Sequence, residues 1–251
     1  MQLRNALALV TGAGRRLGRE IAVALSQGGA DVVLHTYTSS GEETQQAVQQ
    51  YGRRAWIIRG DLADRRDVQR VAREALEKTG KIDILINNAA VFFPTPIATL
   101  TAQEWRAFRQ TNISAPFFLS LLIGRQMYQH RQGKIVFLGD WSGQRPSRNF
   151  LPYCVSKAGV SALTQALAKA FAPHVQVNAV APGPVLLPAD YGPGRQEELR
   201  TRTPLQRFGS PHDIARTVRF LLESGDFVTG ASYVVDGGWL AQGPDGSETS
   251  L

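Results

Sequence analysis

The sequence has little cysteine, little lysine and no long apolar run. Among its 251 residues there is a single cysteine, Cys154, which excludes an internal disulfide framework and a cysteine-rich zinc module. No apolar run approaches the roughly 18 residues that a membrane span needs, and the run before the first glycine is too short for a signal peptide. The histidines show no metal-ligand spacing, so we expect no metal site. These absences favour a cytoplasmic protein without membrane contact.

The net charge of +7 comes mostly from arginine, with 23 arginines against 5 lysines. The arginines are interspersed with acidic residues, as in Asp64-Arg65-Arg66-Asp67, and the chain has no run of five like charges. That pattern is typical of solvated helix faces and not of a nucleic-acid surface. We therefore expect no nucleic-acid partner. A site that receives an anionic small molecule explains the positive charge as well.

Short apolar runs alternate with amphipathic stretches along the chain. The apolar runs do not alternate with polar residues, which indicates strands buried on both faces of a parallel sheet. The strand–helix order predicts an α/β fold: a single Rossmann-type doubly wound parallel sheet of about seven strands, with helices on both faces. We expect strands at 7–10, 32–34, 55–58, 82–86, 134–138, 175–180 and 232–235, and helices at 17–26, 42–51, 64–78, much of 101–131, 153–171 and 211–223.

The chain contains no linker that would divide it. We predict one domain over residues 1–241, followed by a polar tail at 242–251. Residues 182–195 are rich in proline and glycine and lie between a predicted strand and a helical pattern. This segment is predicted to be a long loop over a site.

A glycine-rich turn joins the first strand to the first helix. Gly12, Gly14 and Gly18 permit a tight turn, and the start of the following helix offers free N–H groups to a phosphate. Arg15 and Arg16 lie at the positive end of that helix, where the helix dipole disfavours cations. A nearby anion would offset this cost. The turn is therefore predicted to bind the phosphates of a dinucleotide.

The end of the second strand lacks the acidic side chain that binds the ribose 2′-hydroxyl of NAD. It reads His35-Thr36-Tyr37-Thr38-Ser39 instead. Hydroxyl groups beside an arginine suit a 2′-phosphate. The sequence therefore predicts NADPH in preference to NADH, with His35, Tyr37 and Ser39 among the residues that bind the cofactor.

Tyr153 and Lys157 are four residues apart on a predicted helix, so both side chains lie on one face. An ammonium near a phenol favours the phenolate, and we expect it to lower the pKa of Tyr153 toward the working range. A tyrosine of this kind acts as a general acid or base. The pair follows the fifth predicted strand of a chain that already has a dinucleotide loop, which favours a catalytic role.

With these motifs the chain resembles the short-chain dehydrogenase/reductase family along nearly its whole length. The resemblance rests on Thr11-Gly12-Ala13-Gly14 with Gly18, Asp61-Leu62, Asn87-Asn88-Ala89-Ala90, Asn112, Tyr153-Cys154-Val155-Ser156-Lys157, Val177-Asn178 and Pro182-Gly183. It implies that Asp61 contacts the adenine, that Asn88 and Ala89 line the cofactor channel, and that Asn112 holds a water in a proton relay. It also implies that Lys157 binds the nicotinamide ribose and that a homotetramer forms through the long helices around Asn112 and Tyr153. Further cofactor contacts expected from it are Leu17, Leu62, Ala90, Tyr153, Pro182 and Gly183.

One position departs from the usual pattern of that family. The family usually has a serine 13 residues before the tyrosine, where this chain has Asp140, and Ser142 is only 11 residues before it. An aspartate there resembles the pteridine reductase branch, which includes bacterial dihydromonapterin reductases. Three other stretches are similar to that branch: residues 88–96, with Phe92 where an aromatic ring stacks on the pterin, the substrate loop Leu186-Leu187-Pro188, and Arg16, which matches an arginine that touches both cofactor phosphate and substrate.

Two positions differ from the branch, and two others have alternative interpretations. Ala90 stands where the branch often has serine, and Tyr37-Thr38-Ser39 replaces His-Arg-Ser, which leaves Arg16 and Ser39 to hold the 2′-phosphate. Asp140 can accept hydrogen bonds from the amino and N–H groups of a pterin, or carry a proton itself, but an aspartate can also cap a loop. Phe92 can stack on a flat heterocycle, or belong to the core or to an interface.

We therefore predict an NADPH-dependent oxidoreductase that transfers hydride to a C=N bond of a dihydropterin or a dihydrofolate-like substrate. Tyr153 would donate the proton, assisted by Lys157, Asp140 and Asn112. The residues expected to contact this flat N-heterocycle are Arg16, Phe92, Asp140, Tyr153, Leu187 and Pro188. The alternative is a reductase of the same family that acts on a carbonyl substrate, such as a 3-oxoacyl thioester. A third hypothesis, a regulatory module that only holds NADPH, is less favoured because such proteins tend to lack the Tyr–Lys pair.

Overall fold

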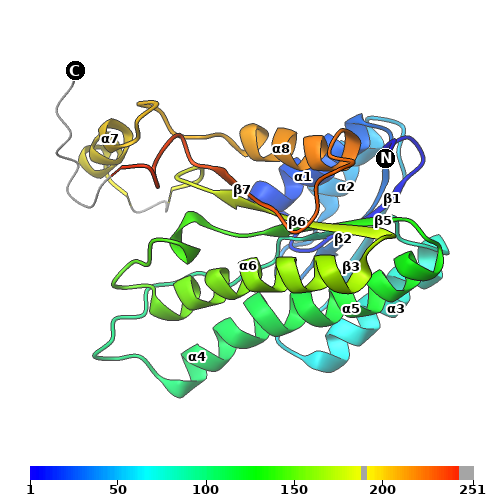
Figure 1. The fold of residues 1–251 in the computed structure, drawn as a ribbon, viewed down its shortest axis with the longest axis horizontal. Helices are drawn as coiled ribbons and strands as arrows, with labels where there is room; N and C mark the ends of the chain where they lie inside the picture. Colours follow the sequence, from blue (N-terminus) through cyan, green and yellow to red (C-terminus); the bar gives the residue numbers. More distant parts are fainter. Residues whose placement is uncertain (188–190, 243–251) are drawn as a thin grey trace.

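A computed structural model describes residues 1–187 and 191–242 and contains one sheet of seven parallel strands (Figure 1). The strand order is β3-β2-β1-β4-β5-β6-β7. This order confirms the predicted doubly wound sheet. It reverses between β1 and β4, which places a crevice at the carboxyl ends of these strands. The strands are β1 (Leu7–Val10), β2 (Asp31–Thr36), β3 (Ala55–Arg59), β4 (Ile84–Asn87), β5 (Gly133–Leu138), β6 (Val175–Pro182) and β7 (Ser232–Val235).

Helices cover both faces of the sheet (Figure 1). One apolar core lies under α1 (Arg16–Gln27), α2 (Glu42–Gln49) and α8 (Pro211–Glu223). The other lies under α3 (Arg65–Thr79), α5 (Ala115–Gln129) and α6 (Leu151–Phe171). Shorter elements complete the described chain: α4 (Ala102–Phe108), the π-helical turn η1 (Arg109–Ser114), the 3₁₀ turn η2 (Trp141–Gly143) and α7 (Pro193–Arg202).

The burial of the strands follows their place in the sheet. Every residue of β1, β2, β4 and β5 is buried, as expected for strands with helices on both sides. The edge strand β7 instead alternates between exposed and half-buried residues. Lateral position in the sheet thus explains why the apolar runs of the central strands are continuous.

Two predicted segments differ from the structure. The long helix expected within 101–131 is divided, because the six residues of η1 separate α4 from α5. The loop predicted at 182–195 is shorter at both ends, since β6 continues to Pro182 and α7 begins at Pro193. Residues 188–190 and 243–251, which include the predicted substrate contact Pro188 and most of the polar tail, lie outside the described residues.

Among the described residues, none of the helices has the length and apolar character needed to cross a bilayer. Nor do the described residues contain a group of three or more His, Cys, Asp or Glu side chains that could hold a metal ion.

Candidate active site

The catalytic pair of the sequence analysis lies on the first two turns of α6, beside the carboxyl end of β5. Tyr153 and Lys157 are 8% and 5% exposed, so both are shielded from bulk water. The Tyr153 hydroxyl donates a hydrogen bond to Oδ2 of Asp140 at 3.1 Å. The Lys157 ammonium lies 5.5 Å from the centre of the Tyr153 ring and donates to the carbonyl of Leu138 at 2.7 Å. The phenol of Tyr153 therefore has the carboxylate of Asp140 as its hydrogen-bond partner and the ammonium of Lys157 near its ring.

The expected lowering of the Tyr153 pKa is wrong in this structure. Burial raises the pKa of Tyr153 well above its usual value, and the charge of Asp140 and its hydrogen bond raise it further. Burial lowers the pKa of Lys157 to about 8, opposed by the charge of Asp140. The phenol is therefore held in its protonated form, which suits a proton donor.

Asp140 serves as a loop cap and also contacts Tyr153. Its Oδ1 accepts from the backbone N–H of Ser142 at 2.8 Å and caps the turn η2, while Oδ2 accepts from Tyr153. The Ser142 hydroxyl is buried and has no hydrogen-bond partner among the described residues. The carboxylate of Asp140, and not the hydroxyl of Ser142, is thus the group at the phenol.

Asn112 joins the loop after β4 to α6. It lies in the π-helical turn η1, and its side chain exchanges two hydrogen bonds with the backbone of Val91, at 2.9 and 3.1 Å. Its Nδ2 also donates to the hydroxyl of Ser156 at 3.1 Å, which in turn donates to the carbonyl of Tyr153 at 2.6 Å. This side chain positions the segment that carries Tyr153, and its role toward a relay water stays a prediction.

Phe92 lies directly against Tyr153. Its ring centre is 4.8 Å from that of Tyr153, edge to face, and 4.8 Å from that of Phe150, with which it is stacked at an interplanar angle of 2°. Phe92 is nevertheless 53% exposed. An exposed aromatic ring next to a buried phenol can contact a flat substrate. Phe150 had no recognisable motif, so the sequence analysis missed it.

The glycine-rich turn has the shape that a dinucleotide phosphate needs. A methyl group at Gly14 would collide with the hydroxyl of Ser39, and one at Gly18 would collide with the carbonyl of Gly12. Gly12 itself has a φ of +64°, which favours glycine. The N-cap of α1, Arg15, makes no side-chain capping bond, and the first turn contains no acidic residue. Its N–H groups are therefore available to an anion.

The loops around this turn are joined by one hydroxyl. Thr11 Oγ1 accepts from the backbone N–H groups of Asn88 and Ala89, at 2.9 and 3.0 Å. The Asn88 amide donates back to the carbonyls of Thr11 and Gly12, at 2.8 and 3.2 Å. Ala90, which follows, is exposed. Thr11 belongs to the motif Thr11-Gly12-Ala13-Gly14, but its hydrogen bonds to the loop after β4 are seen only in the structure.

The residues predicted to bind the cofactor at the end of β2 and the start of α1 differ in exposure. Tyr37 is exposed, Ser39 is half-buried against Gly14, and Arg15 is exposed. His35 is buried, with its ring bonded to the backbone of other loops, so its imidazole does not face solvent. The structure therefore brings Ser39 to the glycine turn, whereas His35 lies beneath it.

Arg16 connects the glycine turn to the predicted substrate loop. Its Nη2 donates to the carbonyl of Leu186 at 3.1 Å, and its backbone has a φ of +53°. Leu17 and Leu187 are half-buried on either side of this contact. The predicted dual contact of Arg16 with phosphate and substrate is compatible with this position.

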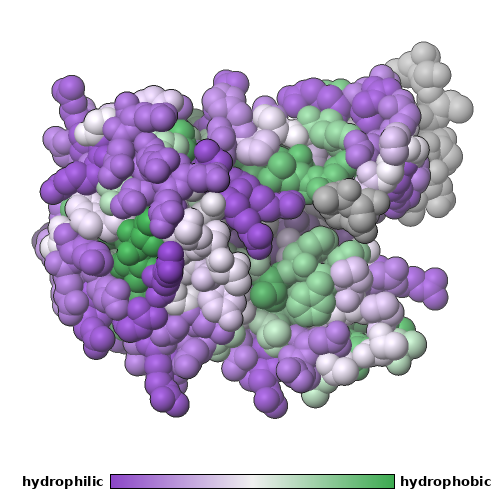
Figure 2. Space-filling model, turned by 180° about the vertical axis from the view of Figure 1, so that it is seen from behind, coloured by the Kyte–Doolittle hydropathy of each residue, from purple (hydrophilic) through white to green (hydrophobic). Residues whose placement is uncertain are grey.

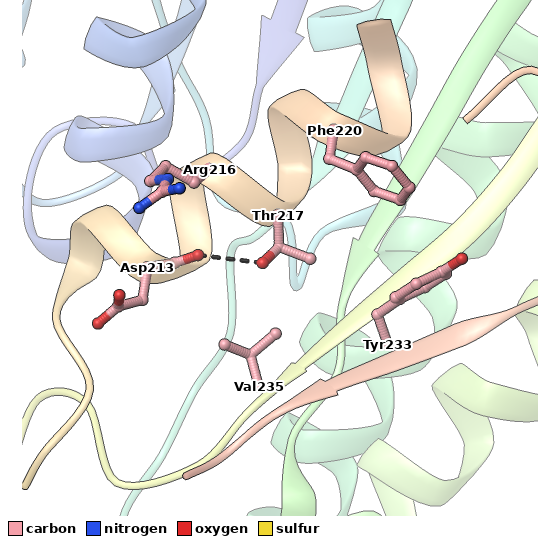
Figure 3. Close-up of a pocket in the computed structure, with 6 residues that line it drawn as sticks. All are labelled: Asp213, Arg216, Thr217, Phe220, Tyr233 and Val235. Carbon is pink, nitrogen blue, oxygen red and sulfur yellow. Dashed lines mark hydrogen bonds between the residues drawn. The ribbon is translucent and has the colours of Figure 1, made fainter. Parts of the chain in front are cut away.

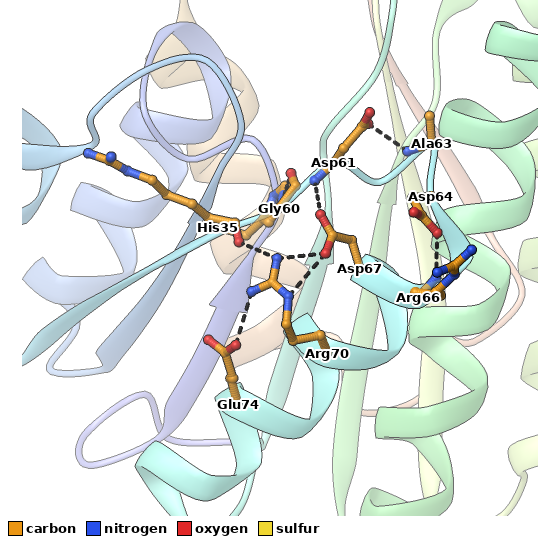
Figure 4. Close-up of polar contacts among 10 residues, drawn as sticks. His35, Gly60, Asp61, Ala63, Asp64, Arg66, Asp67, Arg70 and Glu74 are labelled. Carbon is orange, nitrogen blue, oxygen red and sulfur yellow. Dashed lines mark hydrogen bonds and ion pairs between the residues drawn. The ribbon is translucent and has the colours of Figure 1, made fainter.

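The remaining predicted contacts lie at the carboxyl ends of β3 and β6. Asp61 is half-buried, its Oδ1 accepts from the N–H of Ala63 at 2.9 Å, and Leu62 is buried beside it (Figure 4). Pro182 ends β6, and the N–H of Gly183 donates to the carbonyl of Val235 at 3.0 Å. All these ends share one edge of the sheet, where the surface is hollowed and hydrophobic residues gather (Figure 2).

A separate shallow pocket of about 460 Å³ lies between α8 and β7 (Figure 3). Thr217 donates to the carbonyl of Asp213 at 3.0 Å within it. The pocket contains none of the predicted site residues. Its lining is Asp213, Arg216, Thr217, Phe220, Tyr233 and Val235.

Known proteins show the same organisation over nearly the full length. Residues 12–240 match the family described as enoyl-(acyl carrier protein) reductase. A 2-dehydro-3-deoxy-D-gluconate 5-dehydrogenase of Bacillus subtilis is 35% identical over 96% of this chain and 96% of its own. A 3-oxoacyl-(acyl-carrier-protein) reductase of Staphylococcus aureus is 33% identical over 92% of this chain and 96% of its own. The crystal structure of acetoin dehydrogenase from Salmonella typhimurium has a TM-score of 0.88 and 27% identity, with 96% and 98% of the chains covered.

The doubly wound fold, with a glycine-rich turn after β1 and a Tyr–Lys pair on α6, defines a reductase or dehydrogenase of the dinucleotide-binding type. The family match identifies it further: the chain belongs to the short-chain dehydrogenase/reductase family.

Proposed function

We propose that this protein is an NADPH-dependent reductase that transfers hydride to a C=N bond of a dihydropterin or a dihydrofolate-like substrate. The observation that carries the proposal is the 3.1 Å contact between Asp140 and the Tyr153 hydroxyl, beside the exposed ring of Phe92. A plain ketone has no N–H donors for a carboxylate, whereas a pterin has several.

NADPH, when bound, supplies the hydride. Tyr153 donates its proton to the nitrogen of the reduced bond, since burial and Asp140 keep the phenol protonated. Asp140 uses one lone pair for Ser142 and one for Tyr153, which leaves lone pairs to accept from the amino and N–H groups of the substrate. Lys157 adds a positive charge below Tyr153 and would hold the nicotinamide ribose.

The preference for NADPH rests on the charges around the glycine turn. The loop 37–41 after β2 contains no acidic residue, while Ser39 touches Gly14 and both Arg15 and Arg16 are exposed beside it. We expect kcat/KM to favour NADPH over NADH, and Arg16→Ala to reduce this preference about tenfold or more, since a charge-assisted hydrogen bond is lost. Equal values with both cofactors in the wild type would refute this assignment.

A second candidate is reduction of a carbonyl substrate. It is favoured by the relatives, whose names describe 3-oxoacyl and sugar-acid oxidoreductases. Initial rates with dihydrobiopterin and dihydrofolate, compared with acetoacetyl thioesters, separate the two candidates. Phe92→Leu should raise KM for a flat heterocycle and leave a thioester unaffected, with the fully exposed Phe227→Leu as the matched control. Turnover of thioesters alone would overturn the pterin assignment.

We also propose that the chain forms a homotetramer in the cytoplasm. Large apolar side chains are exposed on the outer helices α4, α5 and α6, namely Trp105, Tyr128, Leu151 and Val155. Exposed apolar surface of this kind favours association. Light scattering after size-exclusion chromatography should give a mass four times that of the chain, and a monomer at micromolar concentration would contradict the proposal.

A further inference from the structure

A single buried imidazole connects two loops of the proposed cofactor site. His35 lies near the end of β2 and is 1% exposed. Its Nδ1 accepts from the N–H of Gly12 at 3.2 Å, and its Nε2 lies 3.0 Å from the carbonyl oxygen of Gly60. A backbone amide can only donate and a carbonyl can only accept. The ring is therefore the neutral tautomer with its proton on Nε2.

The loop that contains Gly60 is held from its other side by α3 (Figure 4). Asp67 Oδ2 accepts from the N–H of Asp61 at 2.7 Å. Arg70 bonds Asp67 at 2.7 Å and the carbonyl of Arg59 at 2.8 Å. The adenine loop, which we define as residues 59–63, is thus fixed between α3 and His35. His35 is the side chain that connects it to the glycine turn.

We propose that His35 is a positioning residue: its neutral tautomer holds the glycine turn and the adenine loop in register, so that acid weakens cofactor binding. This inference rests on the proposed dinucleotide function. A second ring proton would occupy Nδ1 and face the N–H of Gly12. Two donors cannot share a hydrogen bond, so protonation separates the ring from the turn that holds the phosphates.

The surroundings of the ring keep it neutral near neutral pH. Burial lowers the pKa of His35, which the bond to Gly60 opposes. Of the charged groups that face the ring, Asp67 on α3 and Asp61 in the adenine loop raise the pKa, while Arg70 on α3 lowers it. The net direction is downward, so the proton is gained only in acid.

Calorimetric titration with NADP⁺ between about pH 5 and 8 tests the proposal. The matched variant is His35→Asn, whose Oδ1 can accept from Gly12 but cannot titrate. Below the pKa of the ring, the Kd of the wild type should rise relative to that of the variant by up to about tenfold per pH unit, the limit for one linked proton. The 2′-phosphate of NADP⁺ also titrates near pH 6, but it does so equally in both titrations.

Repeating the titration in buffers of different ionisation enthalpy counts protons directly. In acid, wild type should release more protons on binding NADP⁺ than His35→Asn does. His212→Asn, which removes an exposed histidine on α8, should behave as wild type. Parallel pH profiles of wild type and His35→Asn would overturn the proposal, whereas absence of NADP⁺ binding by the wild type at about pH 8 would refute the proposed function instead.

The tautomer can be checked without any variant. Long-range ¹H–¹⁵N spectra of the wild type distinguish a proton on Nε2 from one on Nδ1. We expect His35 to carry its proton on Nε2 at neutral pH, and a proton on Nδ1 would overturn the proposal even if His35→Asn failed to fold.

Discussion

The replacement Asp140→Asn should shift the alkaline limit of the reductase reaction to lower pH. Reduction needs a protonated phenol at Tyr153, so its rate falls as pH rises through the pKa of that phenol. In the wild type, burial and then Asp140 raise this pKa, which keeps the reaction active in alkaline solution. Asparagine keeps the shape of the side chain and removes its charge. The remaining pKa is then lower, and reduction declines at a lower pH.

The size of the effect follows from the distance between the two side chains. The Tyr153 hydroxyl is 3.1 Å from Oδ2 of Asp140. Two like charges about 4 Å apart repel by about 4 kcal/mol at an effective dielectric constant near 20. Asp140 is only half-buried, so we reduce this figure to about 1–3 kcal/mol. At a fixed alkaline pH the phenolate population should then rise roughly five- to 150-fold in the variant.

The assay is the pH profile of kcat/KM for reduction, with wild type and Asp140→Asn compared side by side. Glu77→Gln is the matched control, because Glu77 is an exposed carboxylate near the end of α3, away from the site. Lys157 also titrates, so tyrosinate absorbance measured against Tyr153→Phe assigns the transition to the phenol. An alkaline limit for Asp140→Asn that superimposes on that of the wild type, or lies above it, would refute the reasoning.

Three further outcomes are expected. Tyr153→Phe should lower kcat by about 10² to 10⁴, the usual range for a lost general acid. Calorimetry should show an NADP⁺ affinity within about twofold of wild type. Unchanged turnover would exclude a role of Tyr153 in proton donation. Burial lowers the pKa of Lys157 from 10.5 to about 8. Between these pH values the unfolded chain binds more protons than the folded chain, so the free energy of unfolding should increase by about 3 kcal/mol as pH rises from the lower value to the upper. Urea titrations of Lys157→Met should lack this increase. Gly14→Ala places a methyl group against Ser39 and should weaken NADP⁺ binding about tenfold or more, whereas Gly194→Ala, with open space around it, should bind as wild type.

The strands and helices were predictable because the burial of each element imposes a regular pattern of apolar residues on the sequence. The strands Leu7–Val10 and Ser232–Val235 and the helix Pro211–Glu223 have the predicted bounds, since turn residues flank each. The division of the helix at η1 was missed, although Thr111-Asn112-Ile113-Ser114 and the following Pro116 are weak helix formers that could have signalled it.

The sequence predicted which residues lie together in the site, but it did not predict the direction of the Tyr153 pKa shift. The spacing of Tyr153 and Lys157 placed both side chains together, as the structure has them. The direction of the tyrosine pKa depended on the tertiary structure, because burial raises it and the contact with Asp140 raises it further. The burial of His35 beneath the glycine turn likewise required the tertiary structure, because it depends on contacts with Gly12 and Gly60.

The left-handed backbone conformation of Arg16 sets the stability of the protein against the proposed role of the Arg16 side chain. A left-handed φ of +53° at a non-glycine residue costs on the order of 1 kcal/mol. A glycine at this position would remove this cost and make the protein more stable. It would also remove the guanidinium that donates to the carbonyl of Leu186. If Arg16 binds the cofactor as proposed, selection for thermal stability alone should replace it with glycine, and selection for turnover should restore it.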